Sequence, residues 1–149
     1  MQIKAPITSE EFKSYYQFRW NELRRPLGQP LGFEKDDLEN ISFHLMLVSN
    51  NDILGVGRIH FIVNNLIKKA QIRYMAIDQK IQKRGYGSLL LKELENIAIK
   101  NNVSDIFLHA RESAIPFYIR NGYSKIKESH LLLNTIQHWY MEKKNELPI

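Results

Sequence analysis

The sequence predicts a mixed α+β fold, with helices on both faces of a central and mostly antiparallel sheet. Two observations lead to this prediction. Segments whose apolar residues recur at helical spacing alternate with short apolar runs that are bounded by turn residues. In addition, a chain of 149 residues with 44% hydrophobic and 25% charged residues can bury one good core. We therefore expect a single domain over residues 1–149.

The first half of the chain predicts two helices followed by three strands. Thr8 and Glu11 have the spacing of a capping box, and aromatic and apolar residues then recur at helical spacing, which predicts a helix over residues 9–25. Proline and glycine end this helix, and the acidic stretch 34–40 predicts a second, short helix. The strands of an antiparallel meander are expected at residues 43–48, 53–63 and 70–77.

The second half predicts a helix, a strand, another helix and two final strands. The first of these helices begins near Gly85, and a stripe of leucine and isoleucine runs along it until Asn101. Pro116 falls near the first turn of the next helix, where its missing N–H costs least, and Gly122 caps the end of that helix. The strands are expected at residues 103–110, 123–128 and 136–143, the second helix at 111–121, and a connection at 129–135.

A glycine-containing loop, Q-K-R-G-Y-G-S at residues 82–88, lies between a predicted strand and a predicted helix. Unbonded backbone N–H groups and the helix dipole favour an anion at the start of a helix. Gly85 and Gly87 allow the backbone to approach a ligand closely, and Lys83 and Arg84 add positive charge. The loop therefore predicts a phosphate site, and an ordinary glycine-bearing loop is the simpler alternative.

The spacing within the loop narrows the kind of phosphate site. A P-loop needs G-x-x-x-x-G-K-[ST], which the sequence lacks, and a dinucleotide fingerprint needs a third glycine where Leu90 stands. The remaining pattern, Q-x-x-G-x-G, resembles the pyrophosphate loop of the GCN5-related N-acetyltransferases. This family, abbreviated GNAT, binds the diphosphate of acetyl-coenzyme A.

Two further sets of residues resemble the same family. Residues 114–123, A-I-P-F-Y-I-R-N-G-Y, look like its A-x-x-F-Y-x-x-x-G-[FY] segment. Arg19, Arg24, His44 and the H-x-x-M-x-K pattern at residues 138–143 are similar to a bacterial subgroup that includes ElaA-type proteins. The matches cover nearly the whole chain and imply the GNAT fold, a splayed and mostly antiparallel sheet of about six to seven strands.

The resemblance implies an acetyl-CoA-dependent N-acetyltransferase. The acetyl group would pass to a primary amine of a small-molecule or protein acceptor, by direct attack in a ternary complex. A main-chain N–H of residues 75–77 would polarise the thioester carbonyl. The implied cofactor contacts are Met75, Ala76, Ile77, Gln82, Lys83, Arg84, Gly85, Tyr86, Gly87, Ser88, Arg111, Phe117 and Tyr118.

The resemblance also makes Tyr118 the acid that protonates the departing thiolate. A phenol with a pKa near ~10 is protonated at neutral pH and can donate. The spacing of Tyr118 equally suits a structural tyrosine on an amphipathic helix. Arg111 stands where many members of the family have asparagine, so a contact of this side chain to the pantetheine arm departs from the family pattern.

We expect the acceptor to enter over the first helix and the loop after it, with contacts from Trp20, Arg24, Arg25 and His138. Arg24 or Arg25 would pair with a carboxylate or phosphate of the acceptor, although cations at the end of a helix also suit the dipole there. The general base stays open between water and side chains. The candidate side chains are His44, His60, His109, His130, His138, Glu34, Asp36 and Asp37.

Composition limits the other function classes. A net charge of +5 fits a polyanionic ligand, but no basic run is long enough to argue for nucleic acid, and no histidine pattern suggests a metal site. The sequence has no long apolar run and no cysteine, so we expect no membrane span, no disulfide and a cytoplasmic location. A non-catalytic acyl-CoA-binding module is the alternative to an enzyme. The oligomeric state, a homodimer included, stays open.

Overall fold

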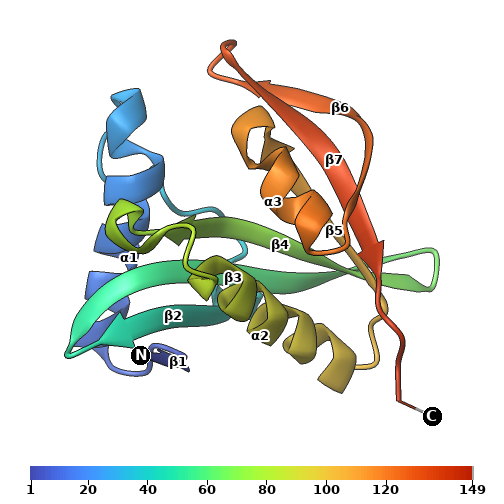
Figure 1. Ribbon diagram of the computed structural model, residues 1–149, viewed down its shortest axis with the longest axis horizontal. Coiled ribbons are helices and arrows are strands. Elements are labelled where there is room, and N and C mark those ends of the chain that lie inside the picture. The colour runs from blue at the N-terminus through green and yellow to red at the C-terminus, as the bar shows by residue number, and fades with distance from the viewer. Residues whose placement is uncertain (149) are drawn as a thin grey trace. The chain divides into compact units, whose positions relative to one another are not determined.

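The computed structural model describes residues 1–148, and it confirms the mixed α+β class (Figure 1). The strands are β1 (Gln2–Lys4), β2 (Phe43–Ser49), β3 (Asp52–Asn64), β4 (Ile67–Ile77), β5 (Asp105–Arg111), β6 (Ser124–Leu132) and β7 (Ile136–Lys144). The α-helices are α1 (Ser9–Leu23), α2 (Tyr86–Lys100) and α3 (Ile115–Arg120). The strands form one seven-stranded sheet in the order β1-β2-β3-β4-β5-β7-β6.

The chain divides into two compact units. Unit 1 comprises Met1–His60 and Tyr74–Ile97, and unit 2 comprises Phe61–Arg73 and the chain from Ala98 onward. Each of β3, β4 and α2 contributes residues to both units. The two units are described separately below.

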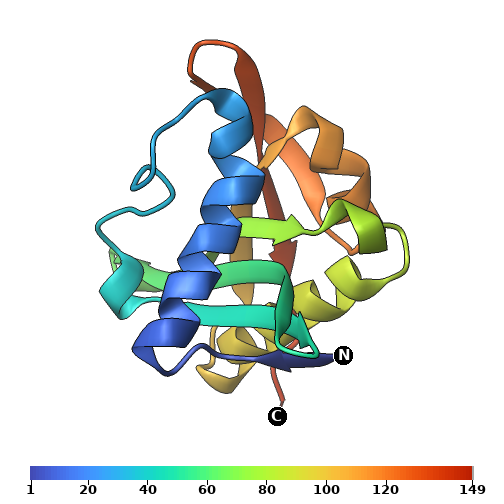
Figure 2. The same cartoon turned by 90° about the vertical axis from the view of Figure 1, so that its left-hand side faces the viewer.

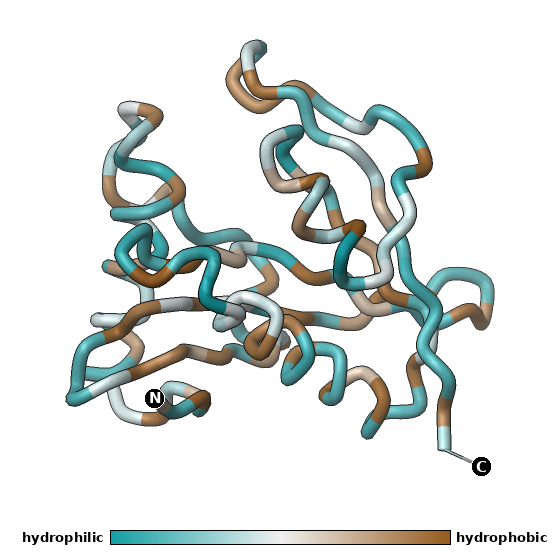
Figure 3. The backbone as a smooth tube through the Cα atoms, in the orientation of Figure 1, coloured by the Kyte–Doolittle hydropathy of each residue, from teal (hydrophilic) through white to brown (hydrophobic). Residues whose placement is uncertain are grey.

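Unit 1 places α1 on one face of its strands and α2 on the other, as Figure 2 shows. The strands β2 and β3 carry the longest hydrophobic stretches of this unit (Figure 3), and Tyr15, Met46 and Val56 form a buried cluster under α1. On the other face, a Cβ at Gly57 of β3 would lie 2.7 Å from a methyl carbon of Leu94 in α2. A larger residue at this position would therefore force the Leu94 side chain to move.

Unit 2 is built on the three-stranded antiparallel ladder of β5, β7 and β6. Its register pairs His109 with Tyr140 and Arg111 with His138. The pairing of β4 with β5 is parallel and occurs at Ala70 with Ile106 and at Gln71 with Phe107.

The helix α3 covers one face of this ladder. The ammonium group of Lys143 in β7 donates to the carbonyl of Asn121 at the end of α3, with a distance of 2.9 Å. Gly122 follows with φ of 93°, as expected for the glycine after a helix, and its Cα faces the Lys143 side chain. Because side chains alternate along a strand, the residues next to Lys143 in the sequence lie on the opposite face.

The N-terminal boundaries differ from the prediction in two places. The helix α1 ends at Leu23 rather than residue 25, because Pro26 continues the chain as the 3₁₀ turn Arg25–Leu27. The predicted short helix over residues 34–40 is wrong, since this stretch forms turns before the 3₁₀ turn Glu39–Ile41. The prediction also missed the short edge strand β1.

The C-terminal boundaries also differ. The predicted helix over residues 111–121 is shorter, because Arg111 ends β5, Glu112–Ala114 form a 3₁₀ turn, and α3 begins at Ile115. Pro116 lies in the first turn of α3, as predicted. The strand β6 extends through most of the predicted connection, since two register shifts let it continue beyond Glu128.

Candidate functional site

The loop over residues 82–88 leads directly into α2 in unit 1. Lys83 and Gly85 have positive φ values of 65° and 88°, and α2 begins at Tyr86. A Cβ at Gly85 would meet no atom within 4 Å, so the space above the loop is open. The first N–H groups of an α-helix have no carbonyl partner within their own helix, so those of α2 can donate to a ligand at the start of the helix.

The same loop is tied to the end of β4. The side-chain amide of Gln82 donates to the carbonyl of Ile77 at 2.9 Å. The 3₁₀ turn Gln79–Ile81 lies between them, with Ile81 buried and the Asp78 side chain capping the turn. The structure therefore holds two predicted cofactor segments together, the loop 82–88 and the end of β4.

Tyr74 directly precedes Met75–Ile77 at the end of β4, and its backbone conformation is unusual. Its φ is 58°, which an aromatic residue within a strand rarely adopts. Three guanidinium groups surround its ring, with distances to the ring centroid of 4.2 Å for Arg19, 5.0 Å for Arg58 and 5.5 Å for Arg24. These contacts surround the residue that directly precedes Met75.

Arg19 and Arg58 are completely buried and are bound to carboxylates of the loop between α1 and β2. The Arg19 guanidinium lies 2.9 Å from Glu39, and the Arg58 guanidinium lies 2.6 Å from Asp36 and 2.8 Å from Glu39. Burial disfavours the charge of Arg58, but the hydrogen bonds to Asp36 and the charge of Glu39 outweigh it and raise the pKa of Arg58. The ion pairs therefore bind the loop between α1 and β2 to Arg19 and Arg58.

This network changes the interpretation of the acidic loop residues. Glu34 is 1% exposed and accepts a hydrogen bond from the backbone N–H of Gly32 at 2.7 Å. Asp36 is held by Arg58, whereas Asp37 is exposed. Of the acidic candidates for the general base, Glu34 and Asp36 are therefore bound within the folded loop, and Asp37 is not buried.

Two of the candidate histidines, His44 and His60, are buried in unit 1 beside this network. His44 accepts a hydrogen bond at Nδ1 from the Tyr15 hydroxyl at 2.9 Å and donates from Nε2 to the carbonyl of Glu39 at 2.8 Å. Burial lowers the pKa of His44. His60 is 1% exposed and its Nδ1 lies 3.3 Å from the Arg58 guanidinium. His44, with both ring nitrogens bonded inside the fold, has no nitrogen left to serve as a general base.

The predicted acceptor contacts in unit 1 cluster at the end of α1. The indole N–H of Trp20 donates to the carbonyl of Gln29 at 3.0 Å, which closes the loop after the helix. The Arg24 guanidinium donates to the carbonyl of Phe33 at 3.1 Å and so spans the same loop. Arg25 is exposed and lies 6.0 Å from the centre of the Trp20 ring. Arg24 thus shapes the loop, while Arg25 faces outward.

In unit 2, Tyr118 is 9% exposed on α3. Its ring packs edge-on against Phe117 and Tyr123, with centroid distances of 5.0 and 5.7 Å. Burial raises the pKa of Tyr118, so the hydroxyl group is protonated at neutral pH and can donate. The structure therefore brings together Phe117 and Tyr118 as predicted neighbours, and it keeps the tyrosine in the form that an acid requires.

The other three histidines lie side by side on β5, β6 and β7. The rings of His130 and His138 stack at 4.4 Å, and the ring of His109 lies 5.4 Å from that of His130. His138 Nδ1 lies 3.1 Å from the carbonyl of Ile136, so Nδ1 carries the hydrogen and Nε2 carries the lone pair. Arg111, predicted as a cofactor contact, is the register partner of His138. Sequence reasoning placed His138 in the site but did not group it with His109 and His130.

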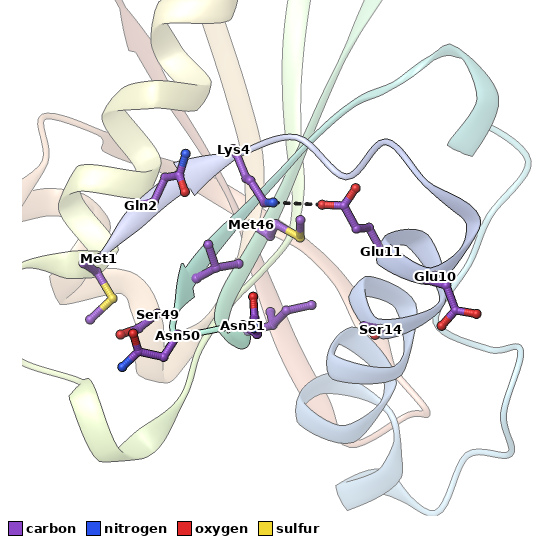
Figure 4. Close-up of a pocket in the computed structure, with 12 residues that line it drawn as sticks. Met1, Gln2, Lys4, Glu10, Glu11, Ser14, Met46, Ser49, Asn50 and Asn51 are labelled. Carbon is purple, nitrogen blue, oxygen red and sulfur yellow. Dashed lines mark ion pairs between the residues drawn. The ribbon is translucent and has the colours of Figure 1, made fainter.

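A recess of about 480 Å³ opens elsewhere in unit 1, among β1, the start of α1 and the turn between β2 and β3 (Figure 4). Lys4 and Glu11 form an ion pair at 2.9 Å in its lining, and the hydrogen bond from Lys4 is the main cause that lowers the pKa of Glu11 to about 2. Glu11 also closes the capping box of α1 with Thr8. None of the predicted site residues lines this recess.

Among the described residues, no helix is long and apolar enough to cross a membrane.

Comparisons with known proteins agree with this architecture. The chain is 27% identical over 143 residues to the uncharacterized N-acetyltransferase YjcF of Bacillus subtilis, a match that covers 95% of this chain and 99% of YjcF. Escherichia coli ElaA has a similar structure, with a TM-score of 0.76, 15% identity and coverage of 96% of this chain and 97% of ElaA. An aminoglycoside 6'-N-acetyltransferase complexed with coenzyme A gives a TM-score of 0.78 at 12% identity and covers 97% of both chains. These two structures show a shared fold.

The family profile gives the more specific result. The acetyltransferase (GNAT) family matches residues 6–123, which include α1, the loop 82–88 and the segment that carries Tyr118. This match spans most of the 149 residues. The chain therefore belongs to the acetyltransferase (GNAT) family.

Proposed function

We propose that this protein is an N-acetyltransferase that moves an acetyl group from acetyl-CoA to a primary amine. The observation that carries the proposal is the open glycine loop at residues 82–88, which presents the start of α2 beside the end of β4. Membership of the acetyltransferase (GNAT) family supports the reaction class. The likeness to E. coli ElaA supports, within that family, the ElaA-like subgroup as the finer assignment.

The residues present fit the diphosphate of coenzyme A. Gly85 leaves the approach to the loop open, and the first N–H groups of α2 are donors for phosphate oxygens. Lys83 and Arg84 are exposed beside them and supply positive charge. When bound, acetyl-CoA supplies the activated acetyl group, and the backbone N–H groups of Met75–Ile77 are the proposed donors to its carbonyl oxygen.

Tyr118 is the proposed acid for the leaving group. The acceptor nitrogen would form a bond to the acetyl carbon and lose one proton to water, while the carbon–sulfur bond would break and the sulfur would take the electron pair. The Tyr118 hydroxyl donates to that sulfur and gives it a proton, and the phenol then regains a proton from solvent. Burial keeps this hydroxyl protonated beforehand. Trp20, Arg24, Arg25 and His138 are the proposed acceptor contacts.

The binding part of the proposal is tested with Gly87→Asp. Gly87 is the second residue of α2 and its φ is not positive, so an aspartate fits the backbone there and suits the helix dipole. It places a negative charge beside the proposed diphosphate. Asn102→Asp adds the same charge in the turn that follows the other end of α2 and serves as a control.

The measurement is thermal unfolding with and without acetyl-CoA. A ligand at about 100 times its dissociation constant stabilises a protein by about 2.7 kcal/mol. We expect this stabilisation in the wild type and in Asn102→Asp and its loss in Gly87→Asp, with unchanged circular dichroism. Full stabilisation of Gly87→Asp by acetyl-CoA would remove the loop from the proposal.

The catalytic part is tested with Tyr118→Phe, which keeps the ring and deletes the hydroxyl. A positioned acid contributes roughly 10²–10⁴-fold to the rate, so turnover should fall within that range while acetyl-CoA affinity stays the same. A wild-type rate in this variant contradicts the role of Tyr118. Acetyl-CoA binding and turnover, measured together, also distinguish an enzyme from a module that only binds acyl-CoA, because such a module binds the cofactor without turnover.

A further inference from the structure

Tyr74 differs from every other non-glycine residue of the described chain that has a positive φ. Those other residues lie in turns and loops between elements, whereas Tyr74 lies inside β4 and is 7% exposed. The φ of Tyr74 is 58°, while a residue in a regular strand has a φ of about −120° to −140°. Such a conformation costs free energy and persists only where the surrounding structure enforces it, which makes it a candidate for a functional role.

This conformation acts directly on Met75. The dihedral angles of Tyr74 set the peptide plane that carries the Met75 N–H, so a positive φ turns that plane relative to its orientation in a regular strand. Met75 is the first of the three residues whose N–H groups are the proposed donors to the thioester carbonyl. The unusual residue of β4 therefore stands where it can determine the direction of a proposed donor.

Three guanidinium groups enclose the ring of Tyr74, and we call Arg19, Arg24 and Arg58 the arginine cage. Arg19 lies 4.2 Å and Arg58 lies 5.0 Å from the ring centroid. Both of these side chains are 0% exposed, and the attraction between a cation and an aromatic ring is strongest where water is excluded. The cage therefore binds the ring and keeps Tyr74 inside the fold.

The arginine cage is itself fixed by the loop between α1 and β2. The Arg19 guanidinium donates to the Glu39 carboxylate at 2.9 Å and to the carbonyl of Glu34 at 3.1 Å. The Arg58 guanidinium donates to the carboxylates of Asp36 and Glu39. Because neither guanidinium can turn without breaking these bonds, they hold the ring of Tyr74 in one position.

We propose that Tyr74 is a positioning residue for acetyl transfer. The arginine cage holds its ring, the held ring keeps its backbone at a positive φ, and this backbone directs the Met75 N–H to the carbonyl oxygen of the acetyl thioester. Donors that are already oriented lower the barrier, because they need no reorganisation when negative charge develops on that oxygen. This inference rests on the proposed function and adds to it the device that orients a donor of Met75–Ile77.

A purely structural role of Tyr74 predicts a different order of variants. If the side chain only fills space in the core, leucine should replace it better than asparagine, because the site is buried. If the positive φ matters, asparagine should replace it better than leucine, because asparagine adopts a positive φ far more readily. Tyr74→Phe keeps the ring in the arginine cage and should resemble the wild type.

Infrared spectroscopy of bound acetyl-CoA measures the donors directly and needs no acceptor. The carbonyl carbon of the acetyl group is labelled with carbon-13, and its stretching frequency is compared between free and bound cofactor. A hydrogen bond to the carbonyl oxygen polarises the C=O bond and lowers this frequency. We expect a lowered frequency in the wild type and in Tyr74→Phe, a part of this shift in Tyr74→Asn, and its loss in Tyr74→Leu.

Ile72→Ala is the matched control. Ile72 is 2% exposed and also lies in β4, two residues before Tyr74, so alanine leaves a cavity in the core and does not change the residue at positive φ. This variant should keep the wild-type carbonyl frequency. Thermal unfolding with acetyl-CoA accompanies each spectrum, and every variant should be stabilised as much as the wild type, since none changes the loop 82–88.

Asp36→Asn tests the arginine cage without changing Tyr74. It weakens the bonds that hold Arg58 and should reduce the infrared shift, whereas loss of a general base would leave the frequency of the bound cofactor unchanged. With an amine that the enzyme acetylates, kcat should fall about 10- to 100-fold in Tyr74→Leu, while the KM for acetyl-CoA stays within about threefold of the wild type. Adding Asp36→Asn to Tyr74→Leu should cause little further loss of kcat, because both act through one device.

Tyr74→Asn and Asp36→Asn keep the test informative if Tyr74→Leu does not fold. Equal infrared shifts in the wild type and in Tyr74→Leu overturn the inference, and so does a larger shift in Tyr74→Leu than in Tyr74→Asn. If acetyl-CoA binds and is turned over while the shift does not depend on Tyr74, the proposed function stands and Tyr74 has only a structural role. If acetyl-CoA does not stabilise the wild type, the proposed function and this inference are both wrong.

Discussion

The two units of the protein treat their arginines in opposite ways. In unit 1, Arg19 and Arg58 are completely buried, and each is within 2.9 Å of a carboxylate from Asp36 or Glu39. In unit 2, Arg73 and Arg111 act on imidazole rings. Burial is the main cause that lowers the pKa of His109, His130 and His138, and the Arg73 charge adds to it at His109 and His130 while the Arg111 charge adds to it at His138.

The buried arginines of unit 1 have a structural role, because their ion pairs lie inside the fold. A buried guanidinium must be paired inside the protein, because its desolvation costs more free energy than packing alone can offset. Arg73 is exposed and Arg111 is partly exposed, so both keep contact with water. The comparison therefore predicts that substitutions of the buried arginines of unit 1, or of the carboxylates that bind them, affect mainly stability.

The largest effect on stability is expected for Glu39→Ala. This substitution removes the carboxylate that binds both Arg19 and Arg58 and leaves two buried cations short of a partner. Breaking a buried ion pair in this way typically costs about 3–5 kcal/mol. Asp37→Ala, an exposed neighbour in the same loop, should change the free energy of unfolding by less than about 0.5 kcal/mol.

Urea unfolding followed by circular dichroism measures both free energies. Glu39→Gln keeps oxygen and nitrogen atoms at the same place and should lie between the two alanine variants, which keeps the test informative if Glu39→Ala does not fold. Equal unfolding midpoints for Glu39→Ala and Asp37→Ala would show that the buried network adds nothing to stability.

A smaller effect is expected from the pH dependence of His138. The pKa of His138 is about 4 in the folded protein against 6.5 as its ordinary value, so the unfolded chain binds a proton first as the pH falls. The stability from the neutral imidazole is complete above about pH 6.5 and is lost as the pH falls towards 4. His44, His109 and His130 change in the same direction.

The urea midpoint of the wild type should therefore drop between pH 7 and pH 5, and that of His138→Gln should drop less. Glu11, whose pKa is about 2 in the folded protein against 4.5 as its ordinary value, contributes a constant stability above about pH 4.5 and loses it only below that pH, so it does not disturb this window. Parallel pH profiles for the two proteins would contradict a neutral, desolvated His138.

Much of this architecture could be predicted from local patterns. The capping box at Thr8, the meander of β2 to β4 and the loop before α2 depend on spacing within short segments, and the structure confirms all three. The segment 34–40 could not be predicted, because its conformation depends on Arg58, which lies about twenty residues away in the sequence.

The candidate site shows the same limit. Backbone N–H groups carry no sequence signature, so the contribution of Met75–Ile77 rests on family resemblance alone. A signal for the buried network was present, since Arg19 interrupts the apolar stripe of α1 and Arg58 interrupts the apolar run of β3. The grouping of His109, His130 and His138 depends on the register of three strands, which no pattern within one strand reveals.

The smallest effects are expected at the end of α1, where the comparison can be made between adjacent arginines. Arg24 donates to the carbonyl of Phe33 and lies over Tyr74, so Arg24→Gln should cost about 1 kcal/mol of stability. Arg25 is exposed, and Arg25→Gln should stay within about 0.5 kcal/mol of the wild type. Urea unfolding of the two variants measures this difference.

Steady-state kinetics on the same two variants then decides whether unit 1 contributes to acceptor binding. If Arg25 contacts the acceptor as proposed, Arg25→Gln raises the KM for the acceptor without a loss of stability and leaves the KM for acetyl-CoA unchanged. Arg24→Gln would alter both stability and acceptor KM, because the loop that it spans would lose its shape. An unchanged acceptor KM in Arg25→Gln would remove Arg25 from the proposed acceptor contacts.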